Sequence, residues 1–212
     1  VKGLCNLALL TGETEREGGG VYPMLTQNNA QGACDMGSLS EFLPGYERVD
    51  DEKARRRFEE IWEKKLPDKP GLTYREMFDS LLEGKIKALY VFGEDPLITL
   101  PNLERLRNGL RQLEFLVVQD QFMTHIGSYA HVILPGVSFA EKEGTFTNME
   151  RRVQRVRKAI SPVGDARPDG EIFCDLSAKM GYPMNYEVPA QVMEEITTLV
   201  PLYAGVTYAG LE

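Results

Sequence analysis

Three short apolar runs constrain the fold of this 212-residue chain more than any other feature. They cover residues 86–92, 115–118 and 132–134, and apolar side chains follow one another in them without alternating with polar ones. Such runs are typical of strands that are buried on both faces of a parallel sheet. Residues 102–112 and 124–130, which separate the runs, have helical patterns. Alternating strands and helices predict an α/β fold, a three-layer domain with a mostly parallel sheet and right-handed crossovers.

Further helices are expected before and after this region. The clearest start is at Thr73, because Thr73 and Glu76 have the spacing of a capping box. The expected helices cover residues 2–10, 51–65, 73–83, 169–180 and 189–199.

Polar residues follow the apolar runs, at the sheet edge where open parallel sheets bind ligands. Carboxylates there would match ribose hydroxyls or the two adjacent N–H donors of a guanine edge. These carboxylates also have purely structural interpretations. Asp95 before Pro96 is typical of a turn, and Asp169 after Pro168 is typical of a helix N-cap. Together they favour nucleotide binding. The residues are Gly93, Glu94 and Asp95, then Gln119 and Asp120, then residues 135–138, and Asp169.

A second polar stretch, QNNAQGACDMG at residues 27–37, has neither a helical nor a strand-like apolar period. Its amides both donate and accept hydrogen bonds, and its glycines let a bulky group approach the backbone. We interpret it as a loop that wraps a large polar ligand. The alternative from residue types alone is a rigid structural loop whose amides satisfy one another.

Composition excludes several classes of function. A net charge of −8 argues against a nucleic-acid partner, because phosphate binding needs a basic face. The sequence contains no run of 18 apolar residues, so it predicts no membrane span, and no segment resembles a signal peptide. One local cluster of basic residues is an exception to the negative charge of the chain. It is typical either of a strand that faces solvent or a partner, or of a phosphate contact. Its members are Arg151, Arg152, Arg155, Arg157 and Lys158.

The three cysteines, Cys5, Cys34 and Cys174, are far apart and form no C-x-x-C pair. They therefore predict neither an iron–sulfur nor a zinc site in this chain. A sparse, odd number of cysteines suits a reducing cytoplasm.

The stretch 27–37 resembles the signature of the molybdenum- or tungsten-dependent bis-pterin-guanine-dinucleotide oxidoreductases, the DMSO reductase superfamily. Within that family the chain is most similar to an internal domain of the formate dehydrogenase catalytic (alpha) subunit. Other segments resemble the family in the family's order, so the resemblance covers nearly the whole chain. They are GEDPL at 93–97, VVQD at 117–120, VILP at 132–135, EKEGTFTN at 141–148 and ERRVQRV at 150–156.

The resemblance implies a catalytic subunit that holds two molybdopterin guanine dinucleotides around one molybdenum or tungsten, with a Rossmann-like domain for each nucleotide. This chain resembles one of these domains, and two-electron redox chemistry would occur at a metal site completed by other domains. Gln27 and Asn29 match the family's loop near the metal. The positions that match its guanosine and phosphate contacts are Gly93, Glu94, Asp95, Thr99, Asp120 and Asp169.

The same resemblance implies parts that lie outside this sequence. The family's metal ligand, a cysteine or selenocysteine followed by histidine, and the cysteines of its 4Fe-4S cluster have no match here. We therefore expect no catalytic or metal-binding residue in this chain and no activity from the isolated chain. His125 and His131 do not match the family's catalytic position and are assigned to ordinary structure. The expected partners are other domains of the same polypeptide and electron-transfer subunits.

One position departs from the formate dehydrogenase pattern. Formate dehydrogenases carry an arginine two residues before Gln27, where it would pair with the formate carboxylate, and this chain has Leu25. Formate as the substrate is therefore left open. A second hypothesis is a non-catalytic scaffold domain of an electron-transfer complex, an NADH dehydrogenase or hydrogenase-associated subunit that has lost the pterin.

The two ends of the sequence suggest that the chain is part of a longer polypeptide. The sequence starts without methionine and ends in Leu211-Glu212, which is typical of a cloning scar. We expect an excised internal segment of a longer polypeptide, with one α/β cofactor-binding domain over residues 1–210. A cofactor-facing loop region is expected in residues 1–50, and the sheet core in residues 85–185.

Overall fold

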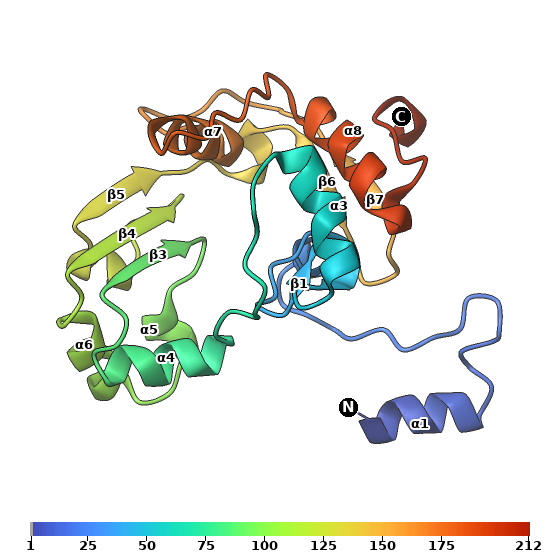
Figure 1. Cartoon of the computed structure of the whole chain (residues 1–212), viewed down its shortest axis with the longest axis horizontal. Helices are drawn as coiled ribbons and strands as arrows, with labels where there is room; N and C mark the ends of the chain where they lie inside the picture. Colours follow the sequence, from blue (N-terminus) through green and yellow to red (C-terminus); the bar gives the residue numbers. More distant parts are fainter. Residues whose placement is uncertain (1) are drawn as a thin grey trace.

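The computed structural model describes residues 2–212, and Val1, where the expected domain begins, lies outside the described residues. The helices and strands follow one another in the order shown in Figure 1. The α-helices are α1 (Lys2–Leu10), α2 (Ala30–Asp35), α3 (Glu52–Trp62), α4 (Tyr74–Leu82), α5 (Pro96–Thr99), α6 (Leu103–Leu110), α7 (Asp169–Lys179) and α8 (Pro189–Leu199). The strands are β1 (Phe42–Leu43), β2 (Glu47–Arg48), β3 (Ala88–Phe92), β4 (Phe115–Asp120), β5 (Val132–Pro135), β6 (Gly144–Thr147) and β7 (Val153–Val156). Short 3-10 helices are η1 (Pro44–Tyr46), η2 (His125–Tyr129), η3 (Phe139–Glu141), η4 (Pro201–Tyr203) and η5 (Ala209–Leu211).

The central sheet has the order β3-β4-β5, and both of its strand pairs are parallel. Val118 of β4 lies opposite Val91 of β3 and Ile133 of β5, so the three predicted apolar runs are adjacent. The prediction of an α/β fold with a parallel sheet is confirmed.

One face of this sheet packs on α4, α5 and α6. The buried side chains form a single cluster that includes Leu81, Leu106, Leu116, Val118 and Ile126. On the other face α7 approaches the carboxyl ends of the strands (Figure 1), and its Phe173 ring lies 5.4 Å from the ring centre of Phe92. Helix α7 therefore covers only the strand-end part of the second face, and β5 keeps Val132 37% and Ile133 38% exposed, so the expected burial on both faces holds for β4 rather than for the whole sheet.

A second hydrophobic cluster joins α3, α8 and the segment after α8. Its buried members include Phe58, Met193, Leu199, Val200 and Tyr203. The β6–β7 hairpin and the short β1–β2 hairpin lie beside these helices, and neither hairpin was predicted from the sequence. The division of the chain into one domain over residues 1–210 remains a prediction.

Several expected helices differ at their ends or in type. The helix expected over residues 51–65 ends at Trp62, because Glu63 takes a left-handed conformation with φ of 50°. The short helix expected over residues 124–130 is the 3-10 helix η2. The capping box of α4 forms as predicted, with the Thr73 amide N donating to Glu76 at 2.8 Å.

The stretch 27–37 is not the loop that its polar composition predicted, because residues Ala30–Asp35 form α2. Tertiary contacts override the weak local preference here. Gly32 is buried, and a Cβ atom there would stand 3.3 Å from the Cβ of Thr147, so the glycine lets α2 lie close to β6.

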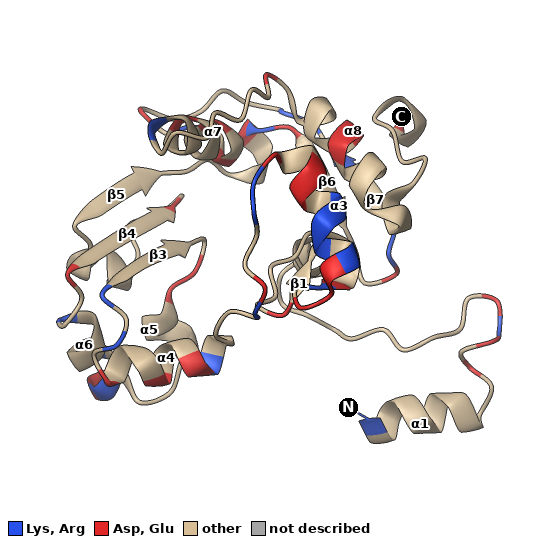
Figure 2. Cartoon of the chain, viewed as in Figure 1, with Lys and Arg blue, Asp and Glu red and all other residues tan. Residues whose placement is uncertain are grey.

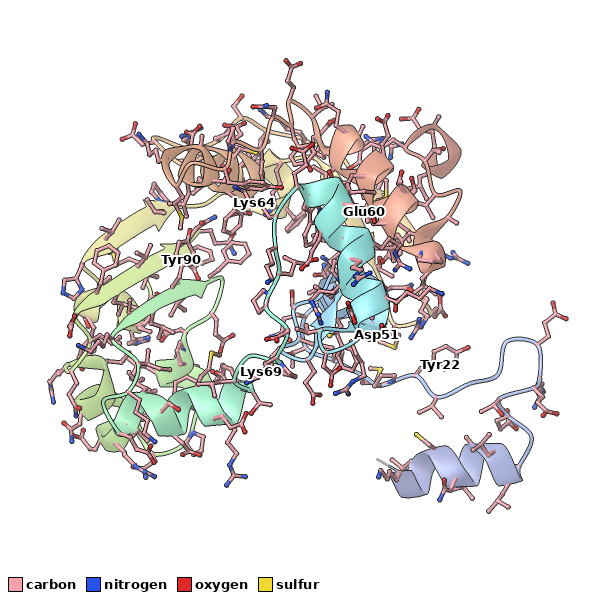
Figure 3. All side chains as sticks on the ribbon, in the orientation of Figure 1. Tyr22, Asp51, Glu60, Lys64, Lys69 and Tyr90 are labelled. Carbon is pink, nitrogen blue, oxygen red and sulfur yellow. The ribbon has the colours of Figure 1, made fainter. Side chains whose placement is uncertain are left out.

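Helix α1 stands apart from the rest of the chain, at the end of an extended segment that carries Tyr22 (Figures 1 and 3). None of its residues is buried, and Leu10 is 85% exposed. Figure 2 shows basic and acidic residues intermixed along α3, whereas Lys2 is the charged residue of α1. No helix within residues 2–212 is both long and apolar enough to cross a bilayer.

Candidate functional site

The carboxyl ends of the strands bring Gly93, Asp120 and Asp169 to one edge of the sheet. The Gly93 amide N donates to the Gln119 carbonyl O at 2.9 Å, and the Gly136 amide N donates to the Asp120 carbonyl O at 3.0 Å. A Cβ atom on Gly136 would stand 2.9 Å from Oδ1 of Asp169, which places the start of α7 directly against β5. The structure therefore groups three residues that are far apart in sequence.

A buried hydrogen-bond network supports this edge. Gln119 is fully buried, and its Nε2 donates to Oδ1 of Asp169 at 2.7 Å. The Tyr90 hydroxyl donates to Oε1 of Gln119, and Nζ of Lys142 forms an ion pair with Oδ2 of Asp169. Burial, followed by the nearby negative charge of Asp169, raises the pKa of Tyr90. Both oxygens of the Asp169 carboxylate are thus engaged within the chain.

Asp169 does not act as the N-cap that its place after Pro168 suggested. Pro168 itself occupies the N-cap position of α7, and no side chain caps this helix. The Asp169 carboxylate instead joins α7 to the sheet through Gln119 and Lys142. The N-cap interpretation is wrong because the carboxylate has stronger, charge-assisted partners across the fold.

The turn after β3 is the open part of the edge. Gly93 has φ of 62°, and a Cβ atom there would meet nothing within 4 Å, so a bulky group can approach its backbone. The half-buried side chain of Glu94 accepts a hydrogen bond from the exposed Thr99 hydroxyl. Burial raises the pKa of Tyr74, which lies beside this pair, and the charge of Glu94 adds to the effect.

Asp95 faces inward. It is the N-cap of α5, is 8% exposed, and accepts the Leu97 amide at 3.1 Å through Oδ1. Its Oδ2 accepts the His125 amide at 2.7 Å and lies 3.0 Å from Nδ1 of the same residue. Most of the acceptor capacity of this carboxylate is therefore used to fix the loop after β3 against η2.

Asp120 has a more open carboxylate. Its Oδ1 accepts the Phe122 amide at 2.9 Å, in an Asx turn that ends β4. Within residues 2–212, Oδ2 of this half-buried aspartate has no hydrogen-bond partner. One oxygen at the strand ends is therefore left to accept from a ligand.

The amide stretch lies elsewhere, against β6 and the second hydrophobic cluster. Oδ1 of Asn29 accepts the Thr147 amide at 2.8 Å, and the exposed Gln27 accepts from the Thr26 hydroxyl at 2.6 Å. Nε2 of Gln31 donates to Oδ1 of Asp35 at 2.7 Å. Gln27 and Asn29 thus belong to a separate part of the site from Gly93 and Asp120.

A buried tyrosine anchors this second part. The Tyr203 hydroxyl donates to Oδ2 of Asp35 at 2.8 Å and lies 2.8 Å from Oγ1 of Thr147. Asp35 is 1% exposed and Tyr203 4%. Burial raises the pKa of Tyr203 to about 12, and its bond to the Asp35 carboxylate adds to the shift. The C-terminal segment therefore fixes the helix that follows the amides.

Leu25, at the position where formate dehydrogenases carry arginine, lies in the extended segment before the amides and is 52% exposed. Arg16 lies earlier in the sequence, and its Nη1 forms an ion pair with Oε1 of Glu13 at 3.6 Å. In residues 2–212 no group of three or more His, Cys, Asp or Glu side chains is placed to hold a metal ion.

Three residues that support the site's carboxylates received no such role from the sequence. Gln119 and Lys142 bind Asp169, and His125 binds Asp95. Gln119 was named as a strand-end residue without a partner, and His125 was assigned to ordinary structure. Lys142 gave no local signal, because its contact with Asp169 depends on the fold.

The fold and the site define an α/β domain whose open sheet edge is lined by a glycine turn and carboxylates. Residues 1–179 match the family model described as Molybdopterin oxidoreductase. The chain belongs to the molybdopterin oxidoreductase family.

Individual relatives agree with this assignment. The chain is 46% identical over 215 residues to the F420-dependent formate dehydrogenase subunit alpha of Methanocaldococcus jannaschii, covering 100% of this chain and 31% of that protein. It is 44% identical over 209 residues to a Bacillus subtilis protein named "Probable oxidoreductase YjgC", covering 99% of this chain and 21% of that protein. The chain thus spans between a fifth and a third of the length of these relatives.

A solved structure supports the fold. Acetylene hydratase from Pelobacter acetylenicus superposes with a TM-score of 0.54 at 18% identity, covering 76% of this chain and 23% of that one. At this identity the likeness concerns the fold alone.

Proposed function

We propose that this chain binds the guanosine and phosphate end of a molybdopterin guanine dinucleotide in the catalytic subunit of a formate dehydrogenase-like oxidoreductase. The observation that carries the proposal is the open strand-end edge. The Gly93 turn admits a bulky group, and the free oxygen of Asp120 faces the same edge that Asp169 closes. Among α/β sheets this is where nucleotides bind.

The residues at the strand ends have the chemistry that a guanosine phosphate requires. Backbone at Gly93 can approach phosphates, and Lys142 adds a positive charge beside Asp169. The Asp120 carboxylate can accept from the guanine N–H edge. Asp95, whose oxygens bind Leu97 and His125, would hold the loop in place. Glu94 and Thr99, which bind each other, would exchange that bond for a ribose or phosphate contact.

The bound cofactor would supply two-electron transfer at a molybdenum or tungsten ion, and the chain's own residues would bind and orient it. Gln27 and Asn29 would face the metal end. The metal ligand, a 4Fe-4S cluster and the electron-transfer partners would come from other domains and subunits of a cytoplasmic enzyme. The isolated chain is then expected to be inactive.

Nucleotide titration of the chain tests the proposal. Guanosine diphosphate should bind with a Kd on the order of 0.1 to 1 mM or weaker, about 4–5.5 kcal/mol, and adenosine diphosphate more weakly still. Asp120→Asn keeps the Asx turn to Phe122 but replaces the free oxygen with a donor, so it should abolish the preference for guanosine. Asp68→Asn, a substitution in the exposed segment before α4, is the matched control. Equal binding of both nucleotides, or an unchanged preference in Asp120→Asn, would refute the site.

Leu25 favours a second candidate, a scaffold domain that has lost the pterin. Leucine has neither charge nor donor with which to bind formate, whereas arginine pairs with a carboxylate through two hydrogen bonds. Pterin analysis of the full-length protein separates the two functions, because a scaffold would contain none. If pterin is present without formate oxidation, Leu25→Arg should introduce that activity.

A further inference from the structure

The side chain of Arg155, in β7, is buried with part of its guanidinium unpaired. It is 9% exposed, and its Nε has no hydrogen-bond partner within residues 2–212. A guanidinium stays charged in proteins, and its five N–H groups can only donate. Buried polar groups are as a rule hydrogen-bonded, and buried charges are paired. The donors of Arg155 therefore point to a closer anionic group than the described residues supply.

An aromatic ring holds this guanidinium in place. Cζ of Arg155 lies 4.0 Å from the ring centre of Tyr208, which is a cation–π contact. Tyr208 belongs to the C-terminal segment, and η5 of that segment lies beside β7 (Figure 1). Burial raises the pKa of Tyr208, the charge of Arg155 opposes this shift, and the charge of Glu143 adds to it. The ring covers one face of the guanidinium, whereas the N–H donors lie in its plane, away from that contact.

The carboxylate of Glu212 lies in front of two arginines. Its Oε1 is 3.6 Å from Nη1 of Arg155 and 3.7 Å from Nη2 of Arg157. Both distances exceed that of an N–H···O hydrogen bond, so the attraction is electrostatic only. Glu212 is 63% exposed and Arg157 57% exposed, so an anion from solution can reach this position and displace the glutamate. One carboxylate oxygen thus marks a position that two guanidinium groups share.

We propose that Arg155 and Arg157 bind a phosphate group at the position of the Glu212 carboxylate. Arginine pairs with phosphate through two parallel hydrogen bonds, and its planar fork matches the geometry of that group. A phosphate has more acceptor oxygens than a carboxylate, so it can accept from both arginines at once. Its charge suits the pair as well, because a phosphate monoester carries about −1.5 to −2 at pH 7.

This site gives a role to the basic cluster of β7, for which a phosphate contact was one of the alternatives that the sequence left open. None of its residues belongs to the strand-end edge, so the inference is independent of the proposed cofactor role.

Calorimetric titration of the full-length protein with inorganic phosphate, at an ionic strength held constant with sodium chloride, tests the site. Arg155→Lys keeps the charge but removes the fork, so it should weaken phosphate binding at least about tenfold. Arg157→Gln, at an exposed position where folding is not at risk, should weaken it roughly threefold or more. Glu212→Gln removes the competing carboxylate and should strengthen it roughly twofold to fivefold.

Arg152→Gln is the matched control, because it removes the same charge from an exposed neighbour in the basic cluster. It should change the affinity by less than about twofold. An equal loss in Arg152→Gln and Arg157→Gln would mean that phosphate is attracted to the whole cluster. Absence of binding by the full-length protein would mean that another part of the polypeptide satisfies Arg155. Either result overturns the proposal.

A second probe, phenyl phosphate, distinguishes the two sources of a phosphate group. Binding at least as tight as that of inorganic phosphate would assign the site to the phosphate monoester of a small molecule. Weaker binding would assign it to free phosphate. In both cases the loss in Arg157→Gln should be the same as with inorganic phosphate, and a phenyl phosphate affinity that this variant leaves unchanged would contradict the site.

Discussion

Removing the Tyr203 hydroxyl is the sharpest test of how the amide stretch is held. Tyr203→Phe keeps the buried ring but deletes two contacts of 2.8 Å, to Asp35 and to Thr147. The Asp35 carboxylate, 1% exposed, then keeps the bond from Gln31 and loses the one from the tyrosine. Helix α2 loses its main link to the C-terminal segment.

The expected loss of folding stability follows from the charge and burial of the Asp35 carboxylate. A hydrogen bond to a charged group contributes about 1.5–3 kcal/mol, and a buried group that loses its partner bears its desolvation cost as well. With the loss of the Thr147 contact, we expect Tyr203→Phe to lower the free energy of unfolding by roughly 2–4 kcal/mol. For a chain of this size that corresponds to a Tm decrease of roughly 5–15 °C.

Urea denaturation of the chain, followed by circular dichroism, measures this cost. Tyr208→Phe is the matched control, because Tyr208 packs in the same cluster and its hydroxyl has no hydrogen bond within residues 2–212. The control should change the free energy of unfolding by no more than about 0.5 kcal/mol. If the two variants are equally stable, the Asp35–Tyr203 bond does not hold α2 and the reasoning is wrong.

Three further predictions concern the same fold. Gly32→Ala should destabilise the chain by roughly 1–3 kcal/mol in urea denaturation, since a Cβ atom there would stand 2.3 Å from Oδ1 of Asn29; a neutral effect would mean that α2 does not pack on β6. Leu116→Ala, at a fully buried position of β4, should cost about 2–5 kcal/mol, whereas Ile98→Ala at a 67% exposed position should cost little. Burial raises the pKa of Tyr203 from 10.0 to about 12, so the folded chain keeps a proton that the unfolded chain loses in this range. Its contribution to stability is full below pH 10 and is lost as the pH rises towards 12, so wild type should lose stability more steeply there than Tyr203→Phe.

The sheet could be predicted from the sequence because its signal is local. The apolar run at residues 115–118 has no polar face, which is typical of a strand buried on both sides. The capping box at Thr73 is local in the same way. Gln119 continues an apolar run as a fully buried amide, a position that is costly unless a partner exists. That partner, Asp169, is 50 residues away, so local patterns could not identify it.

The helix α2 could not be predicted because its stability is not local. Ala30–Asp35 contains a glycine and polar residues, and its propensity alone favours no helix. Its contacts come from Thr147, 118 residues after Asn29, and from Tyr203, 168 residues after Asp35. A pattern search within a window of a few turns does not contain these partners.

The segment between Lys142 and Thr147 joins the two parts of the candidate site. Lys142 binds Asp169 at the strand ends, and the Thr147 amide donates to Asn29 of the amide stretch. Five residues of extended chain span about 17 Å at 3.3 Å per residue, and β6 occupies most of this segment. Because β6 pairs with β7 along its whole length, it links the strand-end carboxylates to the amides through regular structure. An elongated ligand that contacts both parts would need its polar groups at a matching separation. If the chain holds a pterin nucleotide, changes at Lys142 should therefore alter the binding of its nucleotide end, and changes at Thr147 that of its other end.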